Sequence, residues 1–162
     1  MATTTKLLYA SSANLTITLN SLANNAARLS TVIDNSTNLY IDALVGVKIK
    51  TNGTLGSGAA VNVYVYSLVD GTNYTDQDRM GTAGTDSAFT LGGNVMNVKF
   101  IGSVNINTNA VSTYGGLFSV AAAFGGSLPQ KWGVIIENQT GATLDGSNGG
   151  TVSYTGVQLQ SV

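Results

Sequence analysis

One stretch of the sequence alternates between two kinds of side chain, and it constrains the fold more than any other feature. The odd-numbered positions from Leu39 to Ile49 are all apolar, whereas most even-numbered positions from Tyr40 to Lys50 are polar, charged or glycine. An amphipathic helix repeats its apolar residues at spacings of three and four. A period of two over this distance therefore predicts a long β-strand with one buried face.

Shorter segments of similar character follow one another along the chain, separated by Gly, Asn, Asp and Ser. We expect further strands at residues 6–10, 15–19, 30–33, 61–69, 95–106, 116–122, 133–138 and 151–159. Residues 21–28 are the one stretch with any helical character, which their two adjacent Asn weaken. The pattern predicts an all-β protein: one antiparallel, jelly-roll-like β-sandwich of about eight or nine strands. This single domain would span residues 1–162, with a short extended N-terminal arm over about residues 1–6.

The predicted strand at 61–69 carries bulk on both faces. Val61, Val63 and Val65 share one face, and Asn62, Tyr64 and Tyr66 share the other. We therefore expect a central strand that is covered on both sides. The valine side would face the core, and the tyrosine side would face another layer or a neighbouring subunit.

Composition excludes several classes of function. The 162 residues include 20 Gly, 20 Thr, 16 Asn and 15 Ser, but no His and no Cys. The common ligands of zinc, copper, haem and iron–sulfur clusters are therefore missing, and so are Ser-His and Cys-His nucleophile pairs. A net charge of −1 offers no attraction for nucleic acid, and no apolar run is long enough for a membrane span or a signal peptide. We expect no cofactor, and neither nucleic acid nor membrane as a partner.

The polar loop at residues 70–86 suggests a calcium site. It holds Asp70, Asp76, Asp78 and Asp86, half of the acidic residues, together with Asn73. Calcium binds six to eight oxygen ligands, which such loops supply. The spacing does not match an EF-hand, and a solvated loop rich in turn-forming residues explains the same composition. The expectation is a loop without a metal.

A glycoside hydrolase would need two carboxyl groups that face each other across a cleft. The chain offers only Glu137 and seven Asp, of which Asp76 and Asp78 would share a face in an extended segment. No other feature supports this reaction. We therefore expect a protein that is not an enzyme and has no catalytic residues.

Five aromatic residues have two interpretations: Tyr64, Tyr66, Tyr74, Tyr114 and Trp132. They can stack on sugar rings, as in carbohydrate-binding sandwiches, or they can pack across strands and between subunits. We favour packing. In the segment Phe124–Val134, Gly125 and Gly126 allow a turn and Pro129 fixes the backbone ahead of a strand. This segment is expected to deliver Trp132 to a buried position in the core or at a subunit boundary.

Three segments resemble a known group of proteins. They are NLYIDALVGVKIKT (Asn38–Thr51), VNVYVYSLVDGTNYTD (Val61–Asp76) and the region from Leu117 to Leu159, in which the FGGxLPxxWGV run at Phe124–Val134 is the most specific part. Together they resemble small virion structural proteins of tailed bacteriophages, similar to capsid decoration (cement) proteins. The resemblance covers about two thirds of the chain and does not include its first 30 residues.

The resemblance implies a β-sandwich that oligomerises on the outer capsid surface and stabilises the head by clamping neighbouring subunits of the major capsid protein. It implies a homo-oligomer, with a trimer expected first and a dimer next. The protein would be made in the host cytoplasm and reside in the virion. The alternative is a phage tail or fibre component that binds a host-surface glycan. Neither interpretation transfers a catalytic residue, a metal ligand or a defined partner-binding residue to this sequence.

Overall fold

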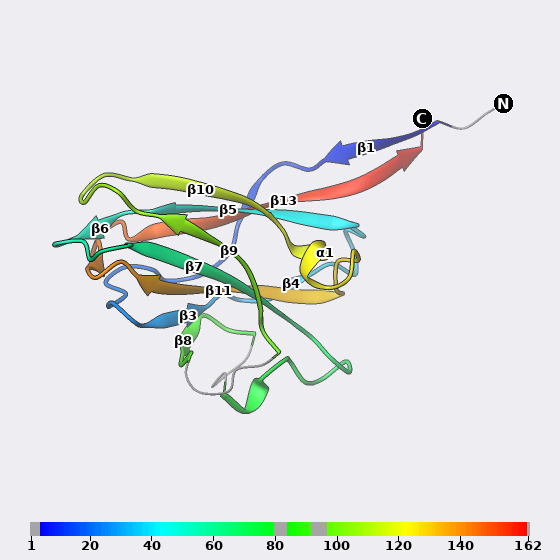
Figure 1. Ribbon diagram of the computed structural model, residues 1–162. Helices are drawn as coiled ribbons and strands as arrows, with labels where there is room; N and C mark the ends of the chain where they lie inside the picture. Colours follow the sequence, from blue (N-terminus) through cyan, green and yellow to red (C-terminus); the bar gives the residue numbers. More distant parts are fainter. Residues whose placement is uncertain (1–3, 80–83, 92–96, 162) are drawn as a thin grey trace.

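The computed structural model describes residues 4–79, 84–91 and 97–161, and two antiparallel sheets face each other within them (Figure 1). One sheet consists of β1 (Thr5–Tyr9), β2 (Ala13–Asn14), β5 (Asp42–Ile49), β10 (Thr113–Ser119) and β13 (Gly150–Ser161). Its order is β1-β13-β5-β10, and β2 also pairs with β13. The other consists of β3 (Ala27–Leu29), β4 (Ile33–Asp34), β7 (Ala60–Ser67), β8 (Ser87–Phe89), β9 (Lys99–Asn105) and β11 (Lys131–Gln139). Its order is β8-β3-β11-β7-β9, and β4 pairs with β11.

The order of the strands makes this sandwich a jelly roll. Its main strands in chain order are β1, β3, β5, β7, β9, β10, β11 and β13. Counted in this order, strands 1, 8, 3 and 6 (β1, β13, β5 and β10) form one sheet. Strands 2, 7, 4 and 5 (β3, β11, β7 and β9) form the other. This pattern arises when paired antiparallel strands wrap around a two-sheet core. The predicted fold class, an all-β antiparallel jelly-roll sandwich, is confirmed.

The predicted number of strands, about eight or nine, agrees with the number of longer strands in the structure. Nine of the described strands have three or more residues. The remaining four have only two, including β6 (Thr51–Asn52) and β12 (Thr143–Leu144), which pair with each other in a small third sheet. Such short pairings carry no periodic signal, so the sequence does not reveal them.

The long alternating segment forms β5, as predicted, but the strand begins later than its pattern suggests. Ala43, Val45, Val47 and Ile49 are all buried in the core. Leu39 and Ile41 continue the same alternation but are exposed. The side chain of Asn35 explains the difference, because its amide donates to the Tyr40 carbonyl and its oxygen accepts from the Tyr40 N–H, both at 2.9 Å. These bonds hold residues 35–40 in a turn.

The main core lies between the sheets, and Trp132 is fully buried in it. The Trp132 ring meets Tyr154 of β13 edge-to-face, with ring centroids 5.5 Å apart. Gly125 and Gly126, with φ of 78° and 93°, turn the chain into the connection that leads to β11. The predicted delivery of Trp132 to a buried position is confirmed, and that position is the core of the sandwich.

A second cluster covers the tyrosine side of β7. Tyr66 is fully buried there beside Leu29 and Ile135, together with Phe89 and Val98 from the segment that connects β7 to β9. The Tyr66 hydroxyl donates to the Ser30 carbonyl at 2.8 Å. The expectation that both faces of β7 are covered is therefore confirmed. The covering layer comes from the same chain.

The two sheets also meet along the seam between β9 and β10. A Cβ built on Gly102 of β9 would lie 2.2 Å from the Phe118 ring, and one built on Gly115 of β10 would lie 2.7 Å from Val104. Each strand therefore offers a glycine where the other places a large side chain. This reciprocal fit closes one side of the sandwich by shape.

The predicted strand at residues 15–19 was wrong, and the weak helical character of residues 21–28 gives no helix. Leu15 and Leu19 are buried as their alternation suggested, but residues 15–19 form no strand. The Thr18 N–H donates to the Asp86 carboxylate, where a strand would bond a neighbouring backbone. Residues 21–26 form tight turns, with N–H to carbonyl bonds from Leu22 to Leu19 and from Ala26 to Ala23, and no helix.

Three other predicted strands and the predicted N-terminal arm needed correction. Of the predicted strand at 30–33, only Ile33 lies in a strand, because between β3 and β4 the Ser30 hydroxyl, in place of a backbone carbonyl, accepts the Val134 N–H. The predicted strand at 116–122 ends in the short helix α1 (Val120–Ala123), which the Ser119 side chain caps by accepting from the Ala122 N–H. The first part of the predicted strand at 95–106 falls partly outside the described residues, and β9 begins at Lys99. Residues 1–3 of the predicted arm also lie outside them, and Lys6 belongs to β1.

Replacing Trp132 with Ala is expected to lower the free energy of unfolding by about 3–5 kcal/mol, because it empties a large volume in the core. Trp132→Phe should cost clearly less, since the indole N–H has no hydrogen-bond partner among the described residues and the ring contact with Tyr154 can persist. Chemical denaturation of the variants measures both effects. An Ala variant as stable as the parent would contradict the core position.

Replacing Gly133 with Ala is expected to destabilise the protein by about 1–3 kcal/mol through overpacking. A Cβ at Gly133 would lie 2.4 Å from Cζ of Tyr66, whose ring covers this glycine. Gly46→Ala is the matched control within another strand, since its nearest contact would be an ordinary 3.5 Å to the Ser153 hydroxyl oxygen. Urea denaturation should separate the two variants, and equal effects would contradict this packing argument.

Candidate interaction surfaces

The carboxylates of the acidic loop form separate structural contacts. Asp70 accepts from the backbone N–H groups of Thr72 and Asn73 and from the Asn73 side chain, at 2.7–3.0 Å. These bonds, with that of the Asn73 side chain the strongest, lower the pKa of Asp70 below its ordinary value. Asp76 accepts from the N–H and side-chain amide of Asn97 and from the N–H of Val98, at 2.8–3.0 Å. Asp70 thus closes its own turn, and Asp76 fixes the approach to β9.

Asp86 anchors the far end of the same loop to the body of the domain. Its carboxylate accepts from the Arg28 guanidinium and from the hydroxyl and N–H of Thr18. Partial burial by itself would raise the pKa of Asp86, but the bonds from Arg28 and Thr18 together hold it below its usual value. Asp78 lies in a short 3₁₀ helix at Gln77–Arg79. The four carboxylates proposed for calcium are not gathered into a site, and no group of three metal-binding side chains occurs within residues 4–79, 84–91 and 97–161.

Glu137, the other carboxylate considered for catalysis, lies on β11 and is nearly buried. It accepts from the Asn62 amide at 2.9 Å, the Tyr64 hydroxyl at 3.1 Å and the Gln139 amide at 2.8 Å. Burial and the Glu137 charge raise the pKa of Tyr64 to about 12. Glu137 therefore links neighbouring positions of the sheet.

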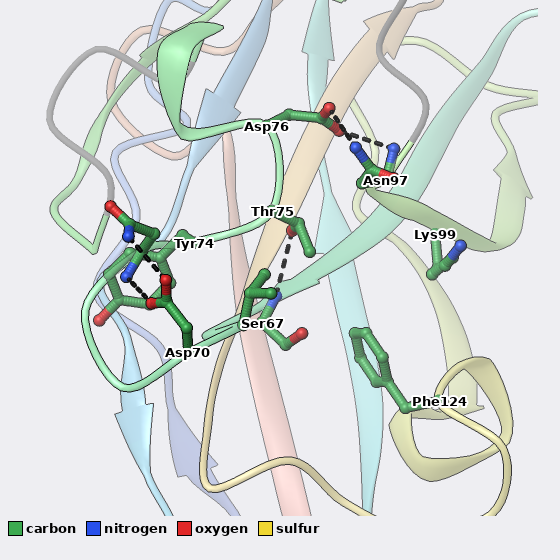
Figure 2. Close-up of a pocket in the computed structure, with 10 residues that line it drawn as sticks. Ser67, Asp70, Tyr74, Thr75, Asp76, Asn97, Lys99 and Phe124 are labelled. Carbon is green, nitrogen blue, oxygen red and sulfur yellow. Dashed lines mark hydrogen bonds between the residues drawn. The ribbon is translucent and has the colours of Figure 1, made fainter.

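An open depression of about 500 Å³ lies between the segment after β7, the start of β9 and the segment after α1 (Figure 2). Asp70 and Tyr74 line one side, and Lys99 and Phe124 line the other. Of its carboxylates, Asp70 accepts from Asn73 in the same loop, and Asp76 accepts from Asn97 ahead of β9. The depression can contact a polar group through described residues such as Asp70 and Lys99. Sequence reasoning missed Lys99 and Phe124, because the fold brings them beside the acidic loop from distant parts of the chain.

The aromatic residues considered for sugar stacking are mostly committed to packing. Tyr66 and Trp132 are fully buried and cannot stack on a sugar. Tyr74 meets Tyr66 edge-to-face at 5.8 Å, and Tyr64 meets Phe100 in the same way at 5.4 Å. Tyr114 is exposed, with the Lys48 ammonium 6.0 Å from its ring centre. The favoured interpretation, packing, is confirmed for Tyr64, Tyr66, Tyr74 and Trp132, whose rings contact other aromatic rings of this chain.

Exposed apolar side chains also lie on a ribbon formed by β1 and the end of β13. This ribbon projects beyond the sandwich, and the pair formed by Thr5 and Ser161 lies at its outer end (Figure 1). Leu7, Tyr9 and Leu159 on it are 56%, 58% and 59% exposed. Sequence reasoning predicted both strands but not their pairing. The alternation of apolar residues at Leu7, Tyr9, Val157 and Leu159 was the available signal.

No protein-family model matches the chain, and no curated protein matches it. Among solved structures the chain is similar to one from desmodium yellow mottle tymovirus, with 13% sequence identity and a TM-score of 0.36. That likeness covers 99% of this chain and 90% of the other. Similarity at this level carries no inference about function. Within the described residues, no helix is both long and apolar enough to cross a membrane.

Replacing Asp86 with Asn is expected to reduce stability by about 1–3 kcal/mol at neutral pH, because Arg28 and Thr18 lose a charged acceptor. Since the folded-state pKa of Asp86 is lowered, its contribution is fully present above the unfolded value of about 4 and is lost as pH falls through the folded pKa. The difference in the free energy of unfolding between the parent and Asp86→Asn should therefore become smaller in acid. Chemical denaturation at a series of pH values from 7 down to about 2 measures this difference. Asp34→Asn, which alters a more exposed pair with Lys131, is the control.

Proposed function

We propose that this protein is a non-enzymatic structural component of a tailed-phage virion, most specifically a capsid decoration protein. In this role it binds the outer surface of the major capsid protein lattice as a homo-oligomer and stabilises the head. The proposal joins the sequence resemblance in the segments 38–51, 61–76 and 117–159 to the surface described above.

The exposed apolar ribbon is the observation that supports this proposal most. Exposed apolar surface that is concentrated in one place usually marks a contact with another molecule. Here the ribbon stands out from a body whose two cores are closed. A rigid body with a projecting apolar ribbon suits a protein that attaches to an assembly.

The chemistry of the body supports the same role. The carboxylates of Asp70, Asp76, Asp86 and Glu137 all accept hydrogen bonds from side chains or backbone of this chain. Such contacts stiffen loops and strands. Jelly rolls form viral capsid domains and also lectin domains, so the fold is compatible with the proposal without establishing it.

Intact particles of the phage that encodes this protein are expected to contain hundreds of copies on the head surface. Mass spectrometry of purified particles gives the copy number, and cryo-electron microscopy gives the position. Purified protein should also bind capsids from which it has been omitted. A copy number in the few or tens, with density on the tail, would contradict the proposal and favour the glycan-binding tail component.

A further inference from the structure

The terminal ribbon has two chemically different faces. Residues directly opposite each other in an antiparallel pair lie on the same face. Leu7 is opposite Leu159, and Tyr9 is opposite Val157, so these four side chains share one face. We call the three exposed members, Leu7, Tyr9 and Leu159, the terminal stripe. Lys6, Leu8, Gln158 and Gln160 occupy the other face.

The ribbon lacks support from the body of the sandwich. The pairing of β13 with β5 ends at Val157 and Asp42, whereas its pairing with β1 continues to Ser161. Beyond Val157 the described ribbon therefore consists of two strands alone. A two-stranded ribbon is marginally stable in water unless its apolar face packs on something. The exposure of the terminal stripe shows that no described part of this chain covers it.

The chemistry of the stripe favours a second copy of the same chain as the cover. A two-fold axis places one surface against itself, which like charges would oppose. The stripe face carries Thr5, Ser161 and the four apolar side chains, and Lys6, the one charged side chain of the described ribbon, lies on the opposite face. At the base of the ribbon Asp42 lies opposite Val157, and its carboxylate accepts from the Ser119 hydroxyl and the Ala121 N–H. The terminal stripe itself therefore pairs with a second copy without burying a charge.

The area approaches what a specific contact needs. From their exposed fractions, the three side chains present roughly 350 Å² of surface, in the range of the largest apolar patches on single proteins, which often mark interaction sites. Two stripes would bury roughly 700 Å² from these side chains alone, and the flanking residues of the ribbon would have to supply the rest of the 1,000 Å² or so that a specific interface needs. We propose that two copies associate through their terminal stripes, forming a small four-stranded sandwich around Leu7, Tyr9 and Leu159. This deepens the proposed function, which includes self-association, and it favours a dimer over the trimer that the resemblance suggested.

Sedimentation velocity over a concentration series tests the association. The parent protein is expected to be a dimer, and Leu159→Asp should raise the dissociation constant by about 100-fold, because each copy would bury an uncompensated carboxylate. Gln160→Asp places the same charge on the next residue of the same strand but on the opposite face, and it should change the constant by less than about threefold. Unchanged Trp132 fluorescence verifies that both variants keep the folded core.

A parent protein that remains monomeric at about 100 µM would overturn the proposal, because a contact that weak is not a specific interface. Equal effects of the two aspartates, or a trimer in place of a dimer, would overturn it as well.

Cross-linking provides a second test that tolerates a change in stability. The chain has no cysteine, so each single-cysteine variant carries one thiol. Packed sheets lie about 10 Å apart, so a bismaleimide of about that length should join two copies of Leu7→Cys. Lys6→Cys, on the other face, should remain uncoupled under the same dilute conditions. Coupling of both variants or of neither would contradict the stripe-to-stripe arrangement.

Capsid binding by the same variants separates this inference from the proposed function. A dimer that behaves as expected but binds no capsids would remove the decoration role and leave the interface intact. If the parent protein is monomeric and binds capsids, and Leu159→Asp abolishes that binding, the terminal stripe contacts the capsid. That result would overturn the proposal that a second copy covers the stripe.

Discussion

The structure depends on burying both faces of the pair formed by β7 and β11. The two strands are hydrogen-bonded in register from Trp132 opposite Ser67 to Gln139 opposite Ala60. Their inner faces fill the space between the sheets, and their outer faces carry Tyr66 and Ile135, which would otherwise meet water. Described residues of the connection between β7 and β9, among them Phe89 and Val98, cover this outer face. Within this connection, the Asp86 carboxylate bonds Arg28 and Thr18, and the Asp76 carboxylate bonds Asn97 and Val98, so both carboxylates hold the connection in place.

Much of the sandwich was predictable because its central strands obey a simple periodicity. β5, β7, β11 and β13 alternate or remain apolar over enough residues for the pattern to exclude a helix. Several of the elements that were predicted wrongly depend on contacts between residues distant in the sequence. Helix α1 interrupts an apolar run because Asp42 accepts from the Ala121 N–H and the Ser119 hydroxyl. No local pattern in residues 116–123 reveals that partner.

The surface was less predictable than the core, for a related reason. The sequence places four carboxylates in one acidic loop, which suggested a calcium site. In the structure Asp86 pairs with Arg28 and Asp76 bonds Asn97, so partners elsewhere in the chain hold these carboxylates apart. The ribbon was hidden because its two strands come from opposite ends of the sequence, and only their register brings Leu7 next to Leu159. The polarity of each side chain follows from the sequence alone, whereas the composition of a surface depends on which strands pair and in which register.

The seam between β9 and β10 has a consequence for how the sequence can change over time. Gly102 accommodates Phe118, and Gly115 accommodates Val104, so each glycine and its large neighbour share one volume. A larger residue at either glycine would be accepted only after its neighbour had become smaller. Homologous sequences should therefore show paired changes at 102 with 118 and at 115 with 104. Covariation at both pairs of positions would identify β9 and β10, from sequences alone, as the strands that meet at this side of the sandwich.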